Sequence, residues 1–186
     1  MKIEHRAPWI AALVAPVLLL SGDVDASELG LVVGQGDEVD IVGVVVRTRE
    51  WNTSSVLSRP WLAVSGEWQF SRWHAREPRV EVSTVTDGSF TAVLTFTPRS
   101  TRSFPPFRRS YIELGLGVHL ISEQSIGADR EFGSAFQFGE FLGTGIRFGS
   151  ANRYSVAVRV QHVSNGRTSE PNDGITFVQG VVRCSF

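Results

Sequence analysis

A histidine and a serine stand two residues apart near the C-terminal end of the chain. His162 and Ser164 belong to the stretch Gln161-His-Val-Ser-Asn-Gly, and Pro171-Asn-Asp-Gly follows a few residues later. A serine hydroxyl is a weak nucleophile until an imidazole takes its proton, and the oxyanion formed by its attack needs fixed hydrogen-bond donors. These residue types could serve such chemistry. The spacing His-x-Ser alone does not establish it, so the elements that position the pair decide.

The residues before the pair alternate in the manner of a β-strand. The run from Tyr154 to Gln161 is rich in β-branched residues, which favours a strand. Residues two apart in a strand share a face, so His162 and Ser164 lie on the side that carries Val156, Val158 and Val160. In a soluble sandwich that valine face would be the core. In a membrane barrel it meets lipid, and the pair lies where this face leaves the hydrocarbon.

The N-terminal segment resembles a secretory signal peptide. Lys2 and Arg6 form a positive region, Ala7–Leu20 is apolar, and Val24-Asp-Ala supplies small residues for cleavage after Ala26. The apolar run is short for a spanning helix. We therefore expect a signal peptide over residues 1–26 and one domain over residues 27–186.

Composition excludes several classes of protein. The mature part has no run of 18 apolar residues, which excludes a helical membrane protein. A net charge of −1 argues against a nucleic-acid partner. The lone cysteine, Cys184, has no partner for an internal disulfide. No metal-ligand cluster is visible, so neither a metal nor another cofactor is expected.

Period-two alternation predicts eight strands and almost no helix. The expected strands are Leu29–Gly34, Val39–Arg49, Trp61–Trp73, Phe90–Thr97, Tyr111–Ser122, Ala135–Gly149, Tyr154–Asn165 and Gly174–Phe186. Turn residues connect them, as in Gly34-Gln-Gly-Asp, Thr86-Asp-Gly-Ser and Ser150-Ala-Asn-Arg. One face of each strand is large and apolar, and the other is small, polar or charged. Several strands reach the length of about 9–11 residues that a tilted membrane strand needs.

The last strand favours a membrane barrel over a soluble fold. Val178, Gly180, Val182 and Cys184 alternate up to a C-terminal Phe186, an ending that resembles the recognition signal of bacterial outer-membrane barrels. We therefore predict an all-β fold, an eight-stranded antiparallel outer-membrane β-barrel with both termini on the periplasmic side. The loops around residues 74–88, 123–133 and 166–173 would then be extracellular. A soluble lipocalin-like barrel, with the valine and leucine faces turned inward, remains open.

At this point the motifs resemble a known family, the outer-membrane lipid A 3-O-deacylases (PagL-like). The resemblance rests on the two motifs around His162 and Pro171, on the stretches beginning at Tyr111, Gly133 and Gly143, and on the C-terminal strand. It implies a barrel that hydrolyses the ester-linked acyl chain at position 3 of lipid A. By motif, Ser164 would be the nucleophile and His162 the general base. The residues expected to form or hold the oxyanion site are Asn165, Gly166 and Asn172.

The chain departs from the family pattern at the acid of the catalytic triad. The family usually carries a glutamate two residues after the glycine of Pro-Asn-x-Gly, whereas this chain has Thr176. A hydroxyl does not stabilise an imidazolium as a carboxylate does. Glu140 is charged on an otherwise apolar outward face, and pairing Phe148 with Tyr154 would set it opposite His162. We therefore expect Glu140 to supply the carboxylate.

The expected function is that of an outer-membrane serine esterase acting on the lipid A of lipopolysaccharide. Its expected partners are this substrate and the outer membrane, with no nucleic acid. The oligomeric state is open, a homodimer being one option. Two alternatives remain: a weak or inactive family member, because Thr176 replaces the acid, and a structural or adhesive barrel, which has no need for an outward His-x-Ser motif.

Overall fold

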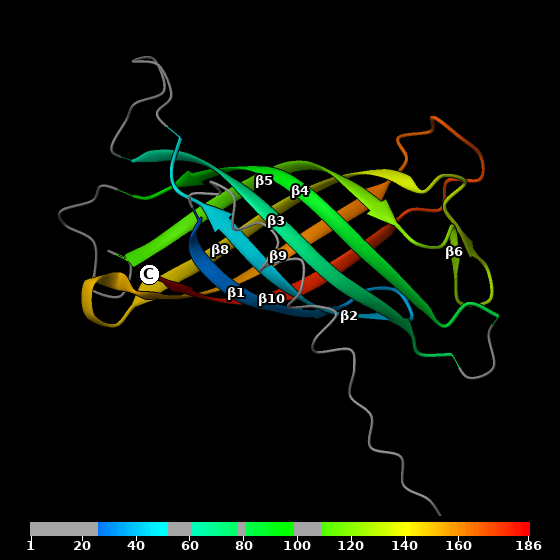
Figure 1. Ribbon diagram of the computed structural model, residues 1–186, viewed down its shortest axis with the longest axis horizontal. Coiled ribbons are helices and arrows are strands. Elements are labelled where there is room, and N and C mark those ends of the chain that lie inside the picture. The colour runs from blue at the N-terminus through cyan, green and yellow to red at the C-terminus, as the bar shows by residue number, and fades with distance from the viewer. Residues whose placement is uncertain (1–25, 52–60, 78–80, 99–108) are drawn as a thin grey trace, which may run out of the picture.

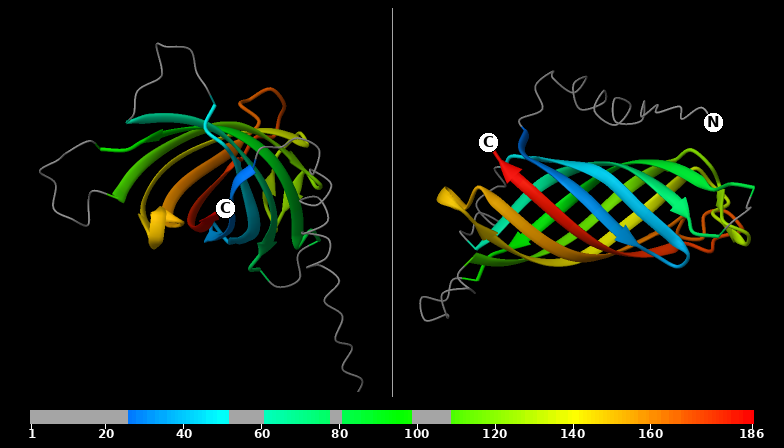
Figure 2. Two further views of the ribbon diagram at one scale, coloured as in Figure 1. Left: turned by 60° about the vertical axis from the view of Figure 1, so that its left-hand side comes forward. Right: turned by 90° about the horizontal axis from the view of Figure 1, so that it is seen from below.

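The computed structural model describes residues 26–51, 61–77, 81–98 and 109–186, which form a closed barrel of eight antiparallel strands (Figure 1). The barrel strands are β1 (Ala26–Gln35), β2 (Val39–Thr48), β3 (Leu62–Ala75), β4 (Thr84–Phe96), β5 (Ser110–Ile121), β8 (Phe136–Phe148), β9 (Tyr154–Ser164) and β10 (Ile175–Ser185). Each pairs with its neighbour in the chain, and β1 closes the barrel on β10 (Figure 2). The expected signal peptide lies outside the described residues, apart from Ala26.

The predicted fold class and all eight strands are confirmed, but two details were not foreseen. Thr86-Asp-Gly-Ser was expected as a turn and lies inside β4. Asp87 is fully buried there and accepts hydrogen bonds from its lumen neighbours His119 and Ser71, which compensates the turn preference of the segment. The loop between β5 and β8 contains a small hairpin, β6 (Ser125–Ile126) and β7 (Arg130–Glu131). A short 3-10 turn, η2 (Ser150–Asn152), joins β8 to β9.

Side chains alternate between an apolar outer wall and a polar interior. On β8, Phe138, Leu142 and Ile146 are exposed on the outside, whereas Gln137 is buried in the lumen. This distribution is the reverse of a soluble barrel and is what a strand between lipid and a polar lumen requires. The lipocalin-like alternative is therefore wrong, because its apolar faces would point inward. No helix in the described ranges is long and apolar enough to span a membrane.

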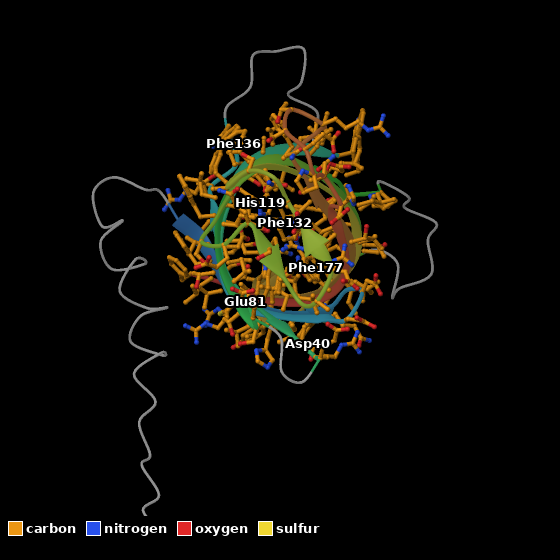
Figure 3. The ribbon with its side chains drawn as sticks, turned by 90° about the vertical axis from the view of Figure 1, so that its right-hand side faces the viewer. Asp40, Glu81, His119, Phe132, Phe136 and Phe177 are labelled. Carbon is orange, nitrogen blue, oxygen red and sulfur yellow. The ribbon has the colours of Figure 1, made fainter. Side chains whose placement is uncertain are left out.

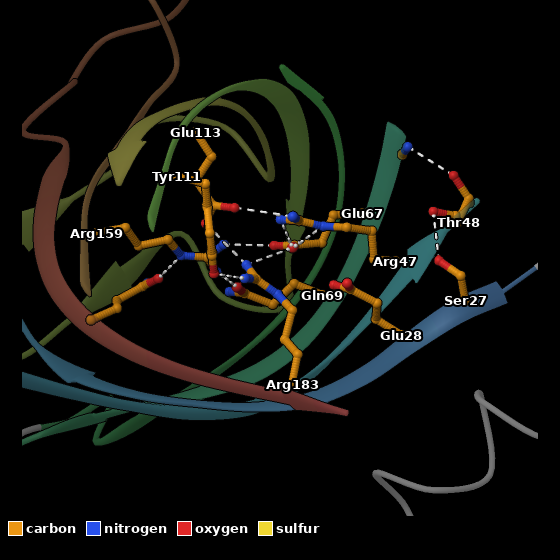
Figure 4. Close-up of polar contacts among 12 residues, drawn as sticks. Ser27, Glu28, Arg47, Thr48, Glu67, Gln69, Tyr111, Glu113, Arg159 and Arg183 are labelled. Carbon is orange, nitrogen blue, oxygen red and sulfur yellow. Dashed lines mark hydrogen bonds and ion pairs between the residues drawn. The ribbon is translucent and has the colours of Figure 1, made fainter. Parts of the chain in front are cut away.

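A buried ionic network fills the middle of the lumen (Figure 4). Glu67 on β3 receives Arg47 at 2.6 Å, Arg159 at 2.6 Å and Arg183 at 3.0 Å. Glu113 on β5 binds Arg47 and Arg183, each at 3.0 Å. These contacts join strands on opposite sides of the barrel, so the network holds the lumen closed. Glu113 is fully buried in the lumen.

An apolar cluster fills the lumen at one end of the barrel, the end that carries the β1–β2, β3–β4, β5–β8 and β9–β10 connections. We call it the site end, because His162 and Ser164 lie there. Trp73, Phe177 and Val163 enter this cluster from the strands, and Phe132 enters it from the loop after β7. Figure 3 labels Phe132 and Phe177 inside the barrel. Trp73 and Phe132 pack edge to face with ring centroids 5.9 Å apart. The β5–β8 loop is therefore anchored inside the barrel mouth.

Candidate active site

His162 and Ser164 are the last outward-facing residues of β9. Both side chains are half-buried, and Val163 between them is fully buried in the apolar cluster of the lumen. Burial of Val163 fixes the parity of the strand end, because a slip of one residue would expose it and turn the other two inward. The predicted outward placement of the pair is confirmed.

Thr176 binds the histidine from the neighbouring strand. It lies opposite His162 in the β9–β10 pairing, and its Oγ1 is 2.9 Å from His162 Nδ1. If Nδ1 carries the ring proton and donates it to the hydroxyl, Nε2 keeps the lone pair that a general base uses. Thr176 thus occupies the place of the expected acid as a neutral hydrogen-bond partner.

Glu140 has the predicted register without the predicted bond. It lies opposite His162 in the β8–β9 pairing, so the imidazole is flanked by Glu140 on one side and Thr176 on the other. Within the described parts of the chain, however, Glu140 makes no hydrogen bond or ion pair, and the Nδ1 contact belongs to Thr176. The role of Glu140 as the carboxylate behind His162 stays a prediction.

Gly174 lies against both candidate catalytic side chains. A Cβ atom added to this residue would stand 3.1 Å from His162 Cε1 and 3.2 Å from Ser164 Cβ. Gly174 also has a φ of +59°, a conformation that side chains disfavour. The motif glycine, which the sequence marks only as a turn, therefore keeps free the space between the imidazole and the serine.

Asn165 organises the loop that follows the serine. Its side-chain amide is buried and donates at 2.7 Å to the carbonyls of Phe132 and Ser169, while its backbone N–H donates to Asn172 Oδ1 at 3.0 Å. Its Oδ1 accepts the N–H of Arg167 at 2.8 Å. These bonds commit its donors to the loop, so of the two expected roles Asn165 is suited to holding the oxyanion site rather than donating to it.

Several donors of the same loop have no acceptor within the part of the chain that the structure describes, and two of them belong to the expected oxyanion residues. The N–H of Gly166 and the side-chain amide of Asn172 make no hydrogen bond as donors to any residue that the structure describes. Gly166 has a φ of +65° and directly follows Asn165. Their role at an oxyanion formed at Ser164 stays a prediction.

A polar cavity of about 270 Å³ opens at the mouth of the barrel, and sequence reasoning did not foresee it. Its carboxylates are Asp37, Glu38, Glu77, Asp129 and Asp173, and its cation is Arg130. A hydrogen bond with Glu77 raises the pKa of the Glu38 carboxyl above its usual value. No group of three or more potential metal ligands in the described ranges is placed to hold a metal ion.

Comparison with known proteins identifies the family. The profile of the family described as Lipid A 3-O-deacylase (PagL) matches residues 42–185. The chain belongs to the PagL family. It is 42% identical over 82 residues to the lipid A deacylase PagL of Bordetella bronchiseptica, covering 41% of this chain and 44% of that protein. It is 42% identical over 67 residues to the lipid A deacylase PagL of Pseudomonas aeruginosa, covering 36% of this chain and 37% of that protein.

These alignments span less than half of either PagL relative. The crystal structure of the outer membrane enzyme PagL superposes with a TM-score of 0.66 at 23% sequence identity. It covers 86% of this chain and 100% of that one. At this identity the superposition supports the PagL barrel fold alone.

Proposed function

We propose that this protein is an outer-membrane serine esterase that removes the 3-O-linked acyl chain from the lipid A of lipopolysaccharide. The observation that carries the proposal is the outward position of His162 and Ser164 at the end of an apolar outer wall. A lipid ester held in the membrane can reach such a site from the side. A site in the lumen would be closed to it by the ionic network and the apolar cluster.

The outer wall below the site offers room for an acyl chain. Two adjoining depressions of about 370 and 440 Å³ lie over β5, β8 and β9 and share Ile112, Thr144 and Val158. The depression of about 370 Å³ reaches Leu142 and Val160. On the outer face these two residues come next after Glu140 and His162, further from the site end. An acyl chain lying in these depressions would have its ester group near Ser164.

The proposed reaction has two steps. Ser164 Oγ attacks the ester carbonyl while His162 Nε2 takes the hydroxyl proton, and the oxyanion accepts hydrogen bonds from Gly166 N–H and the Asn172 amide. The intermediate collapses to an acyl-serine, and the departing 3-oxygen of the sugar takes the proton from His162. Water then attacks the acyl-serine with His162 as base, which releases the fatty acid and returns the proton to Ser164 Oγ.

A catalytically weak or inactive family member is the second candidate. The presence of Thr176 favours this second candidate, because a neutral hydroxyl orients the imidazole without stabilising its charged form as a carboxylate does. A structural barrel is the third, and the outward site is a reason against it. Whether two copies of the chain pair in the membrane stays a prediction.

The direct test is mass spectrometry of lipid A from a host whose outer membrane receives either the wild-type protein or Ser164→Ala. The proposal expects the loss of one 3-hydroxyacyl chain with the wild-type protein and an intact profile with the variant. An intact profile with both, at equal amounts of assembled barrel, would support the inactive or structural alternatives.

A further inference from the structure

The loop hairpin β6–β7 is hydrogen-bonded to the two residues that directly precede β10, the strand that carries Thr176. The N–H of Glu131 donates to Asp173 Oδ2 at 2.7 Å, and the N–H of Asp173 donates to the Glu131 carbonyl at 3.1 Å. One residue away, the Arg130 guanidinium donates through Nη1 to the carbonyl of Gly174. The dipeptide Asp173–Gly174 is thus held by three hydrogen bonds that it makes with Arg130 and Glu131.

The bond from Arg130 lies where the strand pairing stops. The β9–β10 ladder ends with Ile175 opposite Val163, and one further step of the same register would set Gly174 opposite Ser164. The Gly174 carbonyl is instead taken by Arg130, whose charge makes the hydrogen bond a strong one. Arg130 therefore fixes the peptide group at which the chain leaves the candidate site and enters the last strand.

Arg130 is itself rigidly placed. Its neighbours along the hairpin, Ile126 and Phe132, are buried in the apolar cluster of the barrel mouth. Its second nitrogen, Nη2, donates to Asp37 Oδ2 at 2.9 Å, and the Arg130 side chain is 19% exposed while that of Asp37 is 81% exposed. The exposed Asp37 contact contributes little, as surface ion pairs do, so the Gly174 contact is the one that matters for the site.

We propose that Arg130 is a positioning residue of the active site, acting through the Gly174 carbonyl. By holding this peptide group, it keeps the Gly174 backbone clear of the space between His162 and Ser164 and keeps Thr176 in register with His162. The inference rests on the proposed Ser164–His162 site. It assigns Arg130 no contact with the substrate.

The test compares Arg130→Met, Arg130→Lys and Asp37→Asn with the wild-type protein in detergent or lipid, using purified lipid A. Equal barrel assembly is checked by heat-modifiable migration on gels. Arg130→Met is expected to lower kcat by about tenfold to 100-fold, the order of loss that a misplacement of about 1 Å causes, with a change in KM below about threefold. Arg130→Lys restores part of kcat, because its ammonium group can still donate to the carbonyl. Asp37→Asn stays within about twofold of the wild-type protein.

A pH profile distinguishes positioning from a merely structural role. If Arg130→Met loosens Thr176 from Nδ1, the imidazolium loses an acceptor, so the acidic limb of kcat/KM moves to lower pH. Thr176→Val should move it in the same direction. If Arg130→Met does not assemble, Arg130→Lys carries the test, with the same split between kcat and KM. A raised KM with unchanged kcat would overturn the inference in favour of substrate binding, and unchanged kinetics would overturn it outright.

The Ser164→Ala variant, measured alongside, separates this inference from the proposed function. Full activity in Ser164→Ala rejects the site itself. An inactive Ser164→Ala together with a fully active Arg130→Met rejects only the positioning role.

Discussion

Thr176 Oγ1 lies 2.9 Å from His162 Nδ1, across the pairing of the last two strands. The contact orients the imidazole but adds no charge beside it, and because a hydroxyl can donate or accept, the contact does not set the tautomer. A carboxylate at this place would orient the ring, set its tautomer and add the charge. The chain thus has a neutral hydrogen-bond partner at the position where the proposed triad would have its acid, and the first prediction concerns this difference.

Thr176→Glu is expected to raise kcat by at least about tenfold. For scale, a catalytic triad whose acid is replaced loses about 10⁴-fold in kcat. The added carboxylate stabilises the imidazolium, so the acidic limb of kcat/KM moves to higher pH. Thr176→Val should lower kcat about threefold to tenfold, the worth of one hydrogen bond. Steady-state kinetics from about pH 5 to pH 9 check both shifts. Equal activity in all three proteins would show that Thr176 does not act on His162.

Ser164→Ala and His162→Ala should each abolish deacylation while the barrel assembles normally, because both residues lie at the end of β9 on its outer face. The double variant should be no worse than either single one, since the two act as a unit. Lipid A mass spectrometry measures the activity, and heat-modifiable migration measures assembly. Activity retained in Ser164→Ala contradicts its role as the nucleophile.

Glu140→Gln should lower kcat/KM and move its acidic limb to lower pH, whereas Glu140→Asp should retain most of the activity. Directly opposed residues have Cβ atoms about 4.5–5.5 Å apart, so the carboxylate can stabilise a charged His162 without a direct hydrogen bond. The same pH series provides the measurement. If Glu140→Gln and the wild-type protein have identical profiles, Glu140 is not the missing acid.

Gly174→Ala should reduce activity strongly, because the new methyl group would lie between His162 Cε1 and Ser164 Cβ. Gly127→Ala is the matched control. Gly127 also has a positive φ, +77°, but an added Cβ there would meet only Glu77 Oε2, at 3.5 Å. Both variants therefore carry a similar backbone strain, and only one fills the site. Equal losses of activity in the two variants would assign the effect to strain alone.

Glu67→Ala should destabilise the barrel by about 3–5 kcal/mol, the usual cost of leaving buried partners of an ion pair uncompensated. Arg47, Arg159 and Arg183 would all lose this carboxylate. Urea unfolding in lipid vesicles, followed by tryptophan fluorescence, gives the free energy of unfolding, with the exposed Glu123→Ala as the control. A midpoint equal to that of the control would mean that Glu113 suffices for the three arginines.

The alternation of residues was sufficient to predict the barrel, because side chains two apart must share a face whatever the details of the loops. It also placed His162 and Ser164 outward and set Glu140 opposite His162. Side-chain contacts were harder to foresee, because register does not decide which of two flanking residues a ring nitrogen binds. Thr176 therefore took the Nδ1 contact that was expected of Glu140.

The loop contacts left no periodic signal in the sequence. Arg130 lies 44 residues before Gly174, in a loop with no regular pattern, and only the closed barrel brings the two together. The same holds for the bond from Asn165 to Phe132, which spans 33 residues. Thr86-Asp-Gly-Ser was misjudged for a related reason: its local turn chemistry was visible, whereas the distant partner His119 was not.

Val163 is buried in the lumen between the two candidate catalytic residues, so their outward placement depends on assembly of the barrel. The parity of the strand end is set by a side chain that can be buried only after the barrel has closed around it. Thr176 comes from the last strand of the barrel and Gly174 lies just before it, so the final segment of the chain completes the site. Before the barrel closes, the chain therefore carries this serine and this histidine without the arrangement that the proposed esterase needs. Under the proposed function, lipid hydrolysis begins only after the barrel has closed, in the bilayer that holds the proposed substrate.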